Sequence, residues 1–148
     1  MSVEGLIDNN VGARGCVRLR PHVFAPRIAR KIVHELGDRV KASDRLVDDA
    51  ALVVSELVTE SIRKKARELE VDVELVPEQI TVRVRNAHAL APLLGPDDEQ
   101  TPSRSSAVVR HFSSSWGCRR YQHGWEVWAV MRPTTENSAQ LRPRSSDS

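Results

Sequence analysis

Residues 44–69, DRLVDDAALVVSELVTESIRKKAREL, contain a long run of apolar residues at helical spacing. These residues form two adjacent rows, one of Leu46, Ala50, Val53 and Leu57 and one of Val47, Ala51, Val54, Val58 and Ile62. Two adjacent rows make a stripe wide enough to pack against a sheet and a neighbouring helix together. Ser43 or Asp44 is a suitable N-cap. We therefore expect a helix from this cap to about Leu69.

The segments around this helix show shorter patterns. Residues 16–20 alternate apolar and polar, as a half-buried strand does. A helical pattern begins at Ala25-Pro26, and Gly37 is its expected stop. Two hairpins are expected, over residues 71–85 and 116–131, separated by a loop at 87–103 and a short helix at 104–112. In that short helix, we expect Ala107, Val108 and Phe112 to face inward.

The predicted order β-α-α-β-β-loop-α-β-β indicates a two-layer α+β sandwich. We expect about three helices on one face of a mixed or antiparallel sheet of about four or five strands. Residues 1–15 lack a clear period and are predicted to be a flexible arm before a domain at 16–132. Residues 133–148, rich in Ser, Pro, Thr and Arg, are predicted to be a disordered tail.

Composition narrows the classes of protein that this chain can be. Its 148 residues suit one domain, and 22 basic against 20 acidic residues leave a net charge of +2, which gives no sign of a nucleic-acid binder. No apolar run is long enough to span a bilayer, and the start does not resemble a secretory signal. Cys16 and Cys118 form no metal-like cluster. We expect a cytoplasmic protein with reduced thiols and no membrane contact.

Residues 48–66, DDAALVVSELVTESIRKKA, resemble the N box of the GHKL (histidine-kinase-like) ATPases. Among these the pattern is similar to the E-L-V-x-N-A-x-x-H-A helix of the small anti-sigma-factor serine/threonine kinases. Residues 82–86 resemble the strand that ends in the adenine-binding Asp of that family. Residues 103–109 stand in the place of its glycine-rich phosphate segment, and the final hairpin resembles its two closing strands. The resemblance covers about residues 16–132 and implies a GHKL-type (Bergerat) sandwich that binds ATP and Mg²⁺.

The resemblance also implies roles for individual residues. Glu56 matches the glutamate that acts as the catalytic base. The positions of the cofactor-binding residues are held here by Glu60, Lys64, Asn86, Ser103, Arg104 and Ser105. Glu60 stands where the family has the Asn that helps to hold Mg²⁺, so it is the expected metal ligand. A carboxylate there can bind Mg²⁺, but without metal it repels phosphates.

These positions depart from the family pattern together. Lys64 replaces His, and Asn86 replaces the Asp that accepts a hydrogen bond from adenine. The segment from Ser103 to Ser105 lacks the glycines that let backbone amides approach phosphates. Each residue also has a structural interpretation: a solvated face with a Glu60–Lys64 pair, a turn residue at Asn86, and helix-capping serines.

Two functions therefore stay open. The first is a degenerate regulatory member that binds a sigma factor or an anti-anti-sigma antagonist, docking through Arg27, Arg30 and Lys31, which share one helix face. The alternative is an active Mg·ATP-dependent serine/threonine kinase that phosphorylates the anti-anti-sigma protein. A homodimer is compatible with both. Direct nucleic-acid binding through Trp116, Trp125 and Trp128 is disfavoured, because core packing explains at least two of these residues better.

Overall fold

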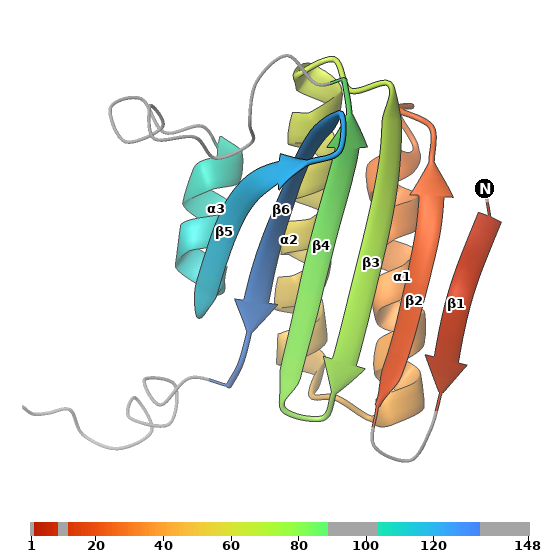
Figure 1. Cartoon of the computed structure of the whole chain (residues 1–148). Coiled ribbons are helices and arrows are strands. Elements are labelled where there is room, and N and C mark those ends of the chain that lie inside the picture. Colours follow the sequence, from red (N-terminus) through yellow and green to blue (C-terminus); the bar gives the residue numbers. More distant parts are fainter. Residues whose placement is uncertain (1, 9–11, 89–103, 134–148) are drawn as a thin grey trace, which may run out of the picture.

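The computed structural model of the chain describes residues 2–8, 12–88 and 104–133 (Figure 1). Six strands and three helices lie within these ranges: β1 (Ser2–Asp8), β2 (Ala13–Leu19), α1 (Ala25–Val40), α2 (Asp44–Arg63), β3 (Glu68–Val76), β4 (Gln79–Ala87), α3 (Arg104–Phe112), β5 (Ser115–Tyr121) and β6 (Gly124–Met131). Among the described residues, no helix is both long and apolar enough to cross a membrane.

The strands form one sheet in the order β1-β2-β3-β4-β6-β5, and every neighbouring pair is antiparallel. The sheet is therefore not mixed, and it is wider than four or five strands. The extra strand is β1, so the prediction of a flexible arm is wrong for Ser2–Asp8. The sequence pattern missed β1 because the backbone groups at the edge of β2 can pair with any extended segment, whether or not the side chains of that segment alternate between apolar and polar. Residues 134–148 of the predicted tail lie outside the described residues.

The three helices lie on one face of the sheet, which confirms the two-layer α+β sandwich (Figure 1). α1 contacts β2 and β3, α2 contacts β4 and β6, and α3 packs beside α2 and against β5. The core between the layers includes the predicted stripe of α2, with Val53, Val54, Leu57 and Val58 fully buried. Gly37 is buried inside α1 rather than ending it. A Cβ there would lie 2.6 Å from Val47 Cγ2, so the glycine permits close packing of α1 on α2.

The sequence predicts the start of α2 correctly but not its end. Ser43 is the N-cap, and its Oγ accepts a hydrogen bond from the Leu46 amide at 3.2 Å. The helix ends at Arg63, earlier than the predicted end at Leu69. Lys65 adopts a left-handed conformation (φ 67°), which stops the helix without a glycine. The chain then enters β3, where Leu69 is buried and pairs across the ladders with Leu19 and Asn86.

α3 spans the predicted residues but turns a different face inward. Its buried residues are Ser105, Ser106 and Val109, whereas Ala107 is exposed. Val108 and Phe112 are only partly buried against the core. The prediction that Ala107 faces inward is wrong, because α3 packs against the polar side of α2 and places its serines there.

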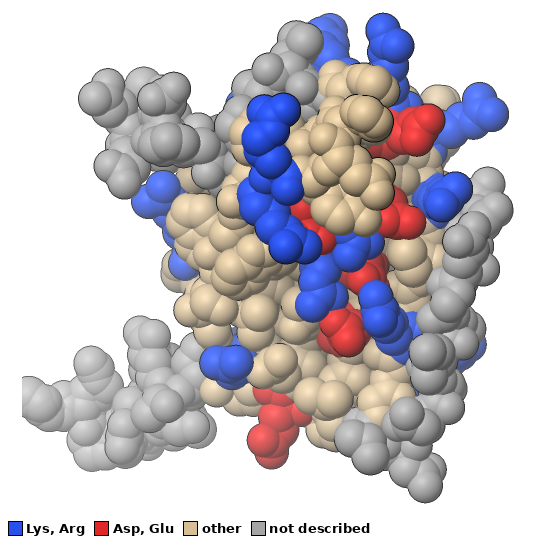
Figure 2. Space-filling view, viewed as in Figure 1, with Lys and Arg blue, Asp and Glu red and all other residues tan. Residues whose placement is uncertain are grey.

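The sheet face away from the helices, here called the outer face, carries a lattice of ion pairs. In Figure 2, blue and red side chains interleave across it. Arg85 Nη1 lies 2.9 Å from Glu70 Oε1, and its Nε lies 2.7 Å from Glu126 Oε2. Burial alone would lower the pKa of the Arg85 guanidinium, but hydrogen bonds to these two carboxylates raise it. Asp72 is fully buried beneath Arg14, Arg83 and Arg85. The charges of this face are therefore largely matched within it.

Candidate functional site

Glu56 and Glu60 project from the polar edge of α2, one helical turn apart. Glu56 is half-buried, and Glu60 is only 8% exposed. Residues four apart lie on the same side of a helix, so both carboxylates face α3. The wide apolar stripe occupies the other side of α2. The two residues that the resemblance assigns to catalysis and metal binding are therefore brought together.

The first turn of α3 contacts both carboxylates directly. Arg104 Nε donates to Glu56 Oε2 at 3.0 Å. The fully buried Ser105 Oγ lies 3.2 Å from Glu56 Oε1, 3.2 Å from the Glu56 carbonyl oxygen and 3.4 Å from Glu60 Oε1. These two predicted phosphate-binding residues thus bind the predicted catalytic and metal-binding residues. Ser103, also predicted there, lies outside the described residues.

Basic side chains of the same helix complete the surroundings of Glu60. Arg63 Nη1 lies 3.4 Å from Glu60 Oε1, and Lys64 Nζ lies 3.9 Å from Glu60 Oε2. The expected Glu60–Lys64 pair is confirmed. Both contacts are between helix neighbours, and their partners reach solvent, so each stabilises the fold only slightly. Their effect on the site is to neutralise a carboxylate that is otherwise poorly solvated.

Asn86 belongs to β4 rather than to a turn after the strand, which corrects the structural interpretation made from sequence. Its side chain is 4% exposed. Nδ2 donates to Ser61 Oγ on α2 at 3.3 Å, and Oδ1 accepts from the Trp125 amide at 3.1 Å. The amide thus links α2, β4 and β6. Its acceptor oxygen, which stands where the family has the adenine-binding carboxylate, already accepts one hydrogen bond from the protein.

Among the described residues, the groups expected to hold Mg·ATP are hydrogen-bonded to protein groups. Ser105 Oγ lies against both Glu56 and Glu60, where the metal ion is expected, and Asn86 Oδ1, where adenine is expected, accepts from the Trp125 amide. The two carboxylates are hydrogen-bond acceptors whose nearest donors come from the protein itself. Chemically, the cluster fastens α3 to α2.

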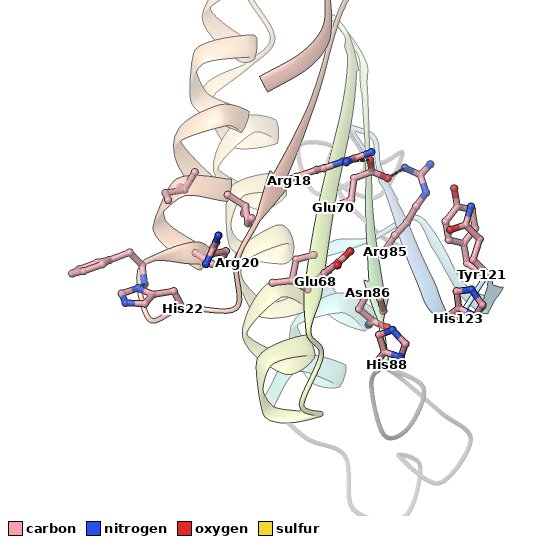
Figure 3. Close-up of a pocket in the computed structure, with 17 residues that line it drawn as sticks. Arg18, Arg20, His22, Glu68, Glu70, Arg85, Asn86, His88, Tyr121 and His123 are labelled. Carbon is pink, nitrogen blue, oxygen red and sulfur yellow. Dashed lines mark hydrogen bonds and ion pairs between the residues drawn. The ribbon is translucent and has the colours of Figure 1, made fainter. Parts of the chain in front are cut away.

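A large cavity lies elsewhere, at the end of the sheet beside the start of α1 (Figure 3). Its volume is about 920 Å³, and four chain segments line it: residues 18–28, 68–70, 85–88 and 121–123. Of the predicted site residues, only Asn86 is among its lining. Sequence analysis missed this cavity because no motif connects those four segments; the one available signal was the concentration of His and Arg at three of the strand ends.

The three tryptophans are half-buried, and two of them contact arginines. The guanidinium of Arg110 lies 5.3 Å from the Trp116 ring centre, and that of Arg120 lies 5.0 Å from the Trp125 ring centre. Trp128 lies over Gly117 on the outer face. Trp116 packs against the core, so the expectation that at least two tryptophans do so is met only in part.

Comparison with known proteins supports the fold. No family model and no curated protein matches this sequence. Among solved structures, the chain is similar to the crystal structure of the RsbU and RsbW domains of Rv1364c from Mycobacterium tuberculosis, with a TM-score of 0.61 and 14% identity. The match covers 80% of this chain and 31% of that protein. The chain therefore has a two-layer α+β fold similar to the matched part of that structure.

At 14% identity, this likeness concerns the path of the backbone and not the chemistry of the site. Because the chain spans less than a third of that protein, it has no counterpart for most of the protein's length. Fold alone does not imply function, which depends on the groups placed at a site. The side-chain contacts at Glu56, Glu60 and Asn86 therefore carry the functional argument.

Proposed function

We propose that this chain is a regulatory protein that binds a sigma factor or an anti-anti-sigma antagonist and has little or no kinase activity. The resemblance to anti-sigma-factor kinases suggests the class of partner. One observation supports binding rather than turnover: Ser105 Oγ lies within hydrogen-bond distance of both Glu56 and Glu60. The side chains expected to handle Mg²⁺ and phosphate are thereby engaged with one another.

Nucleotide binding in this region would carry an energetic cost. A hydrogen bond to a charged group contributes roughly 1.5–3 kcal/mol, and a buried carboxylate that loses its donor also bears a desolvation penalty. An incoming ATP phosphate would have to draw the Ser105 hydroxyl and the Arg104 guanidinium away from Glu56, which would leave the Glu56 carboxylate without these donors and beside another anion. Serine and arginine in place of glycine also block close approach of backbone amides.

Calorimetric titration with Mg·ATP tests this proposal. We expect a dissociation constant weaker than about 100 μM, equivalent to less than about 5.5 kcal/mol of binding free energy. The combined variant Glu60→Asn, Asn86→Asp, Ser103→Gly and Ser105→Gly restores the family pattern and should bind more tightly, provided that circular dichroism shows it folded. Low-micromolar binding by the wild type that disappears in Glu60→Ala would overturn the proposal and restore the kinase hypothesis.

Phosphoryl transfer provides a separate measurement. The purified chain is incubated with labelled ATP and each candidate antagonist domain, with Glu56→Gln as the matched control. We expect no label on the antagonist above the Glu56→Gln background. Serine phosphorylation that requires Glu56 would refute the non-catalytic function, whatever the affinity for nucleotide.

A further inference from the structure

The cavity at the end of the sheet, here called the sheet-end cavity, has two kinds of wall. Leu19, Leu69 and the start of α1 (Phe24, Ala25 and Ile28) supply an apolar wall. The opposite side carries imidazole, phenol and guanidinium groups, with Tyr121, His88 and His123 visible beside one another in Figure 3. A cavity of about 920 Å³ is large enough to hold bulky side chains or a small ligand.

The rim of this cavity exposes large apolar side chains. Val23 is 78% exposed and Phe24 is 53% exposed, immediately before α1. The Phe24 ring is held in place from two sides: its centre lies 5.2 Å from the His22 ring and 5.7 Å from the Arg27 guanidinium. An exposed but ordered aromatic group costs little conformational entropy when it is covered, which suits a binding contact.

In the described ranges, cationic side chains that form no ion pair lie at the cavity and along the start of α1. Within the described part of the chain, no ion pair involves Arg20 at the cavity or the α1 cationic face, defined as Arg27, Arg30 and Lys31. The arginines of the outer face, in contrast, are paired with buried or half-buried carboxylates. Among the described lining residues of the cavity, Arg20 and Glu68 are the charged groups outside any ion pair, and the α1 cationic face adds three cations beside the cavity.

We infer that the sheet-end cavity and the α1 cationic face together bind an acidic segment of the partner protein. A bulky apolar side chain of that segment enters the cavity against Phe24 and Leu19, and flanking carboxylates pair with Arg20, Arg27, Arg30 and Lys31. That the ligand is a protein rests on the proposed function. Charge steers the segment to this end of the molecule, and burial of the apolar anchor holds it there.

Peptide titration followed by two-dimensional amide NMR of the ¹⁵N-labelled full chain tests the inference. The probe is the synthetic peptide EDDLFEDE; EDDSGEDE lacks the apolar anchor and KRRLFKRK reverses the charge. We expect EDDLFEDE to shift the amide signals of Leu19, Phe24, Ala25 and Leu69. The two other peptides should bind at least about tenfold more weakly, since the first lacks the burial and the second reverses the charge complementarity.

Two variants assign the contacts. Phe24→Ser, and separately the triple reversal Arg27→Glu, Arg30→Glu and Lys31→Glu, should each weaken EDDLFEDE binding at least about fivefold. All of these positions are exposed or half-buried, so the fold should persist. Only the triple reversal should also reduce the dependence of affinity on salt.

A triple reversal of Lys41, Lys65 and Arg132 is the matched control, because it makes the same change in net charge at exposed positions away from the cavity. Equal weakening by this control would show an effect of net charge alone and overturn the inference. Absence of amide shifts at the cavity, or equal shifts with KRRLFKRK, would also overturn the inference.

Saturation by 8-anilinonaphthalene-1-sulfonate with no response to EDDLFEDE would assign the cavity to a small aromatic anion instead. None of these results depends on Mg·ATP affinity, so the docking surface and the non-catalytic function can fail independently.

Discussion

Replacement of Ser105 by alanine tests whether the first turn of α3 is fastened to α2. The Ser105 side chain is fully buried, and its Oγ has three acceptors within 3.4 Å, from Glu56 and Glu60. A hydroxyl has a single proton, so it donates to one of these acceptors at a time. The substitution therefore removes one strong hydrogen bond rather than three, and it opens almost no volume.

The expected magnitude follows from two opposing effects. Loss of a hydrogen bond to a carboxylate costs roughly 1.5–3 kcal/mol. Alanine is a better helix former than serine by about 0.5 kcal/mol, which offsets part of that cost. Ser105→Ala should therefore lower the free energy of unfolding by about 1–2.5 kcal/mol. Arg104→Ala should lower it by less than about 1 kcal/mol, because the Arg104 side chain is 69% exposed and its ion pair with Glu56 is screened by water.

Equilibrium unfolding in urea, followed by circular dichroism, measures these differences. Ser113→Ala is the matched control. Among the described residues, the hydrogen-bond partner of Ser113 Oγ is the Met131 sulfur, at 3.7 Å, and its loss should cost less than about 0.5 kcal/mol. An unchanged m-value would show that the same surface unfolds in each variant. If Ser105→Ala proved as stable as the wild type, α3 would not be fastened to the carboxylates, and the argument against nucleotide binding would lose its main support.

Three further predictions concern the core and the outer face. Leu57→Ala should lower the free energy of unfolding by roughly 2–5 kcal/mol, because Leu57 is fully buried. Leu52 is half-buried, so Leu52→Ala should cost clearly less. Equal losses in urea unfolding would show that the apolar stripe of α2 is not the side that faces the core. Asp72→Asn should cost about 2–4 kcal/mol, because it removes a fully buried carboxylate that Arg14 shares with the half-buried Arg83 and Arg85. Glu74→Gln should cost less than about 1 kcal/mol, because the Glu74 side chain is 43% exposed; the reverse order in urea unfolding would refute the lattice. Burial, with the nearby acidic charges, raises the pKa of Cys16 from 9.0 to about 11. At pH 8 its thiolate fraction should thus fall about a hundredfold, and alkylation by iodoacetamide, followed by peptide mass spectrometry, should be correspondingly slower in the folded chain than in urea; equal rates would contradict the shift.

Part of the candidate site was predictable because it lies within one helix. Glu56 and Glu60 share an edge of α2 by spacing alone, and the Glu60–Lys64 pair follows from the same spacing. The identity of their partners was not predictable in this way. Arg104 and Ser105 are about 45 residues further along the chain, and only the packing of α3 on α2 places them against the carboxylates.

The role of Asn86 shows the same limit. Its position near the end of β4 follows from the alternation of residues 80–85, and its likeness to the adenine-binding residue of the GHKL family follows from motif order. Its two hydrogen bonds join Ser61 on α2 and the Trp125 amide on β6. Neither bond has a signature in sequence, because both depend on how a helix and a distant strand meet β4. The sheet-end cavity was missed for the same reason.

Local periodicity by itself determined α2, the two hairpins and the bounds of α3, since each depends on residues within one or two turns or within a short loop. Tertiary structure alone decided the inward face of α3 and the formation of the sheet-end cavity. In both cases, the deciding contacts join segments far apart in the chain. Side-chain packing between layers forms only when those segments meet, and the residue pattern within one segment does not specify its partner. Periodicity also missed two local features, the pairing of β1 with its neighbour β2 and the end of α2 at Arg63. Backbone pairing at a sheet edge likewise leaves no side-chain pattern.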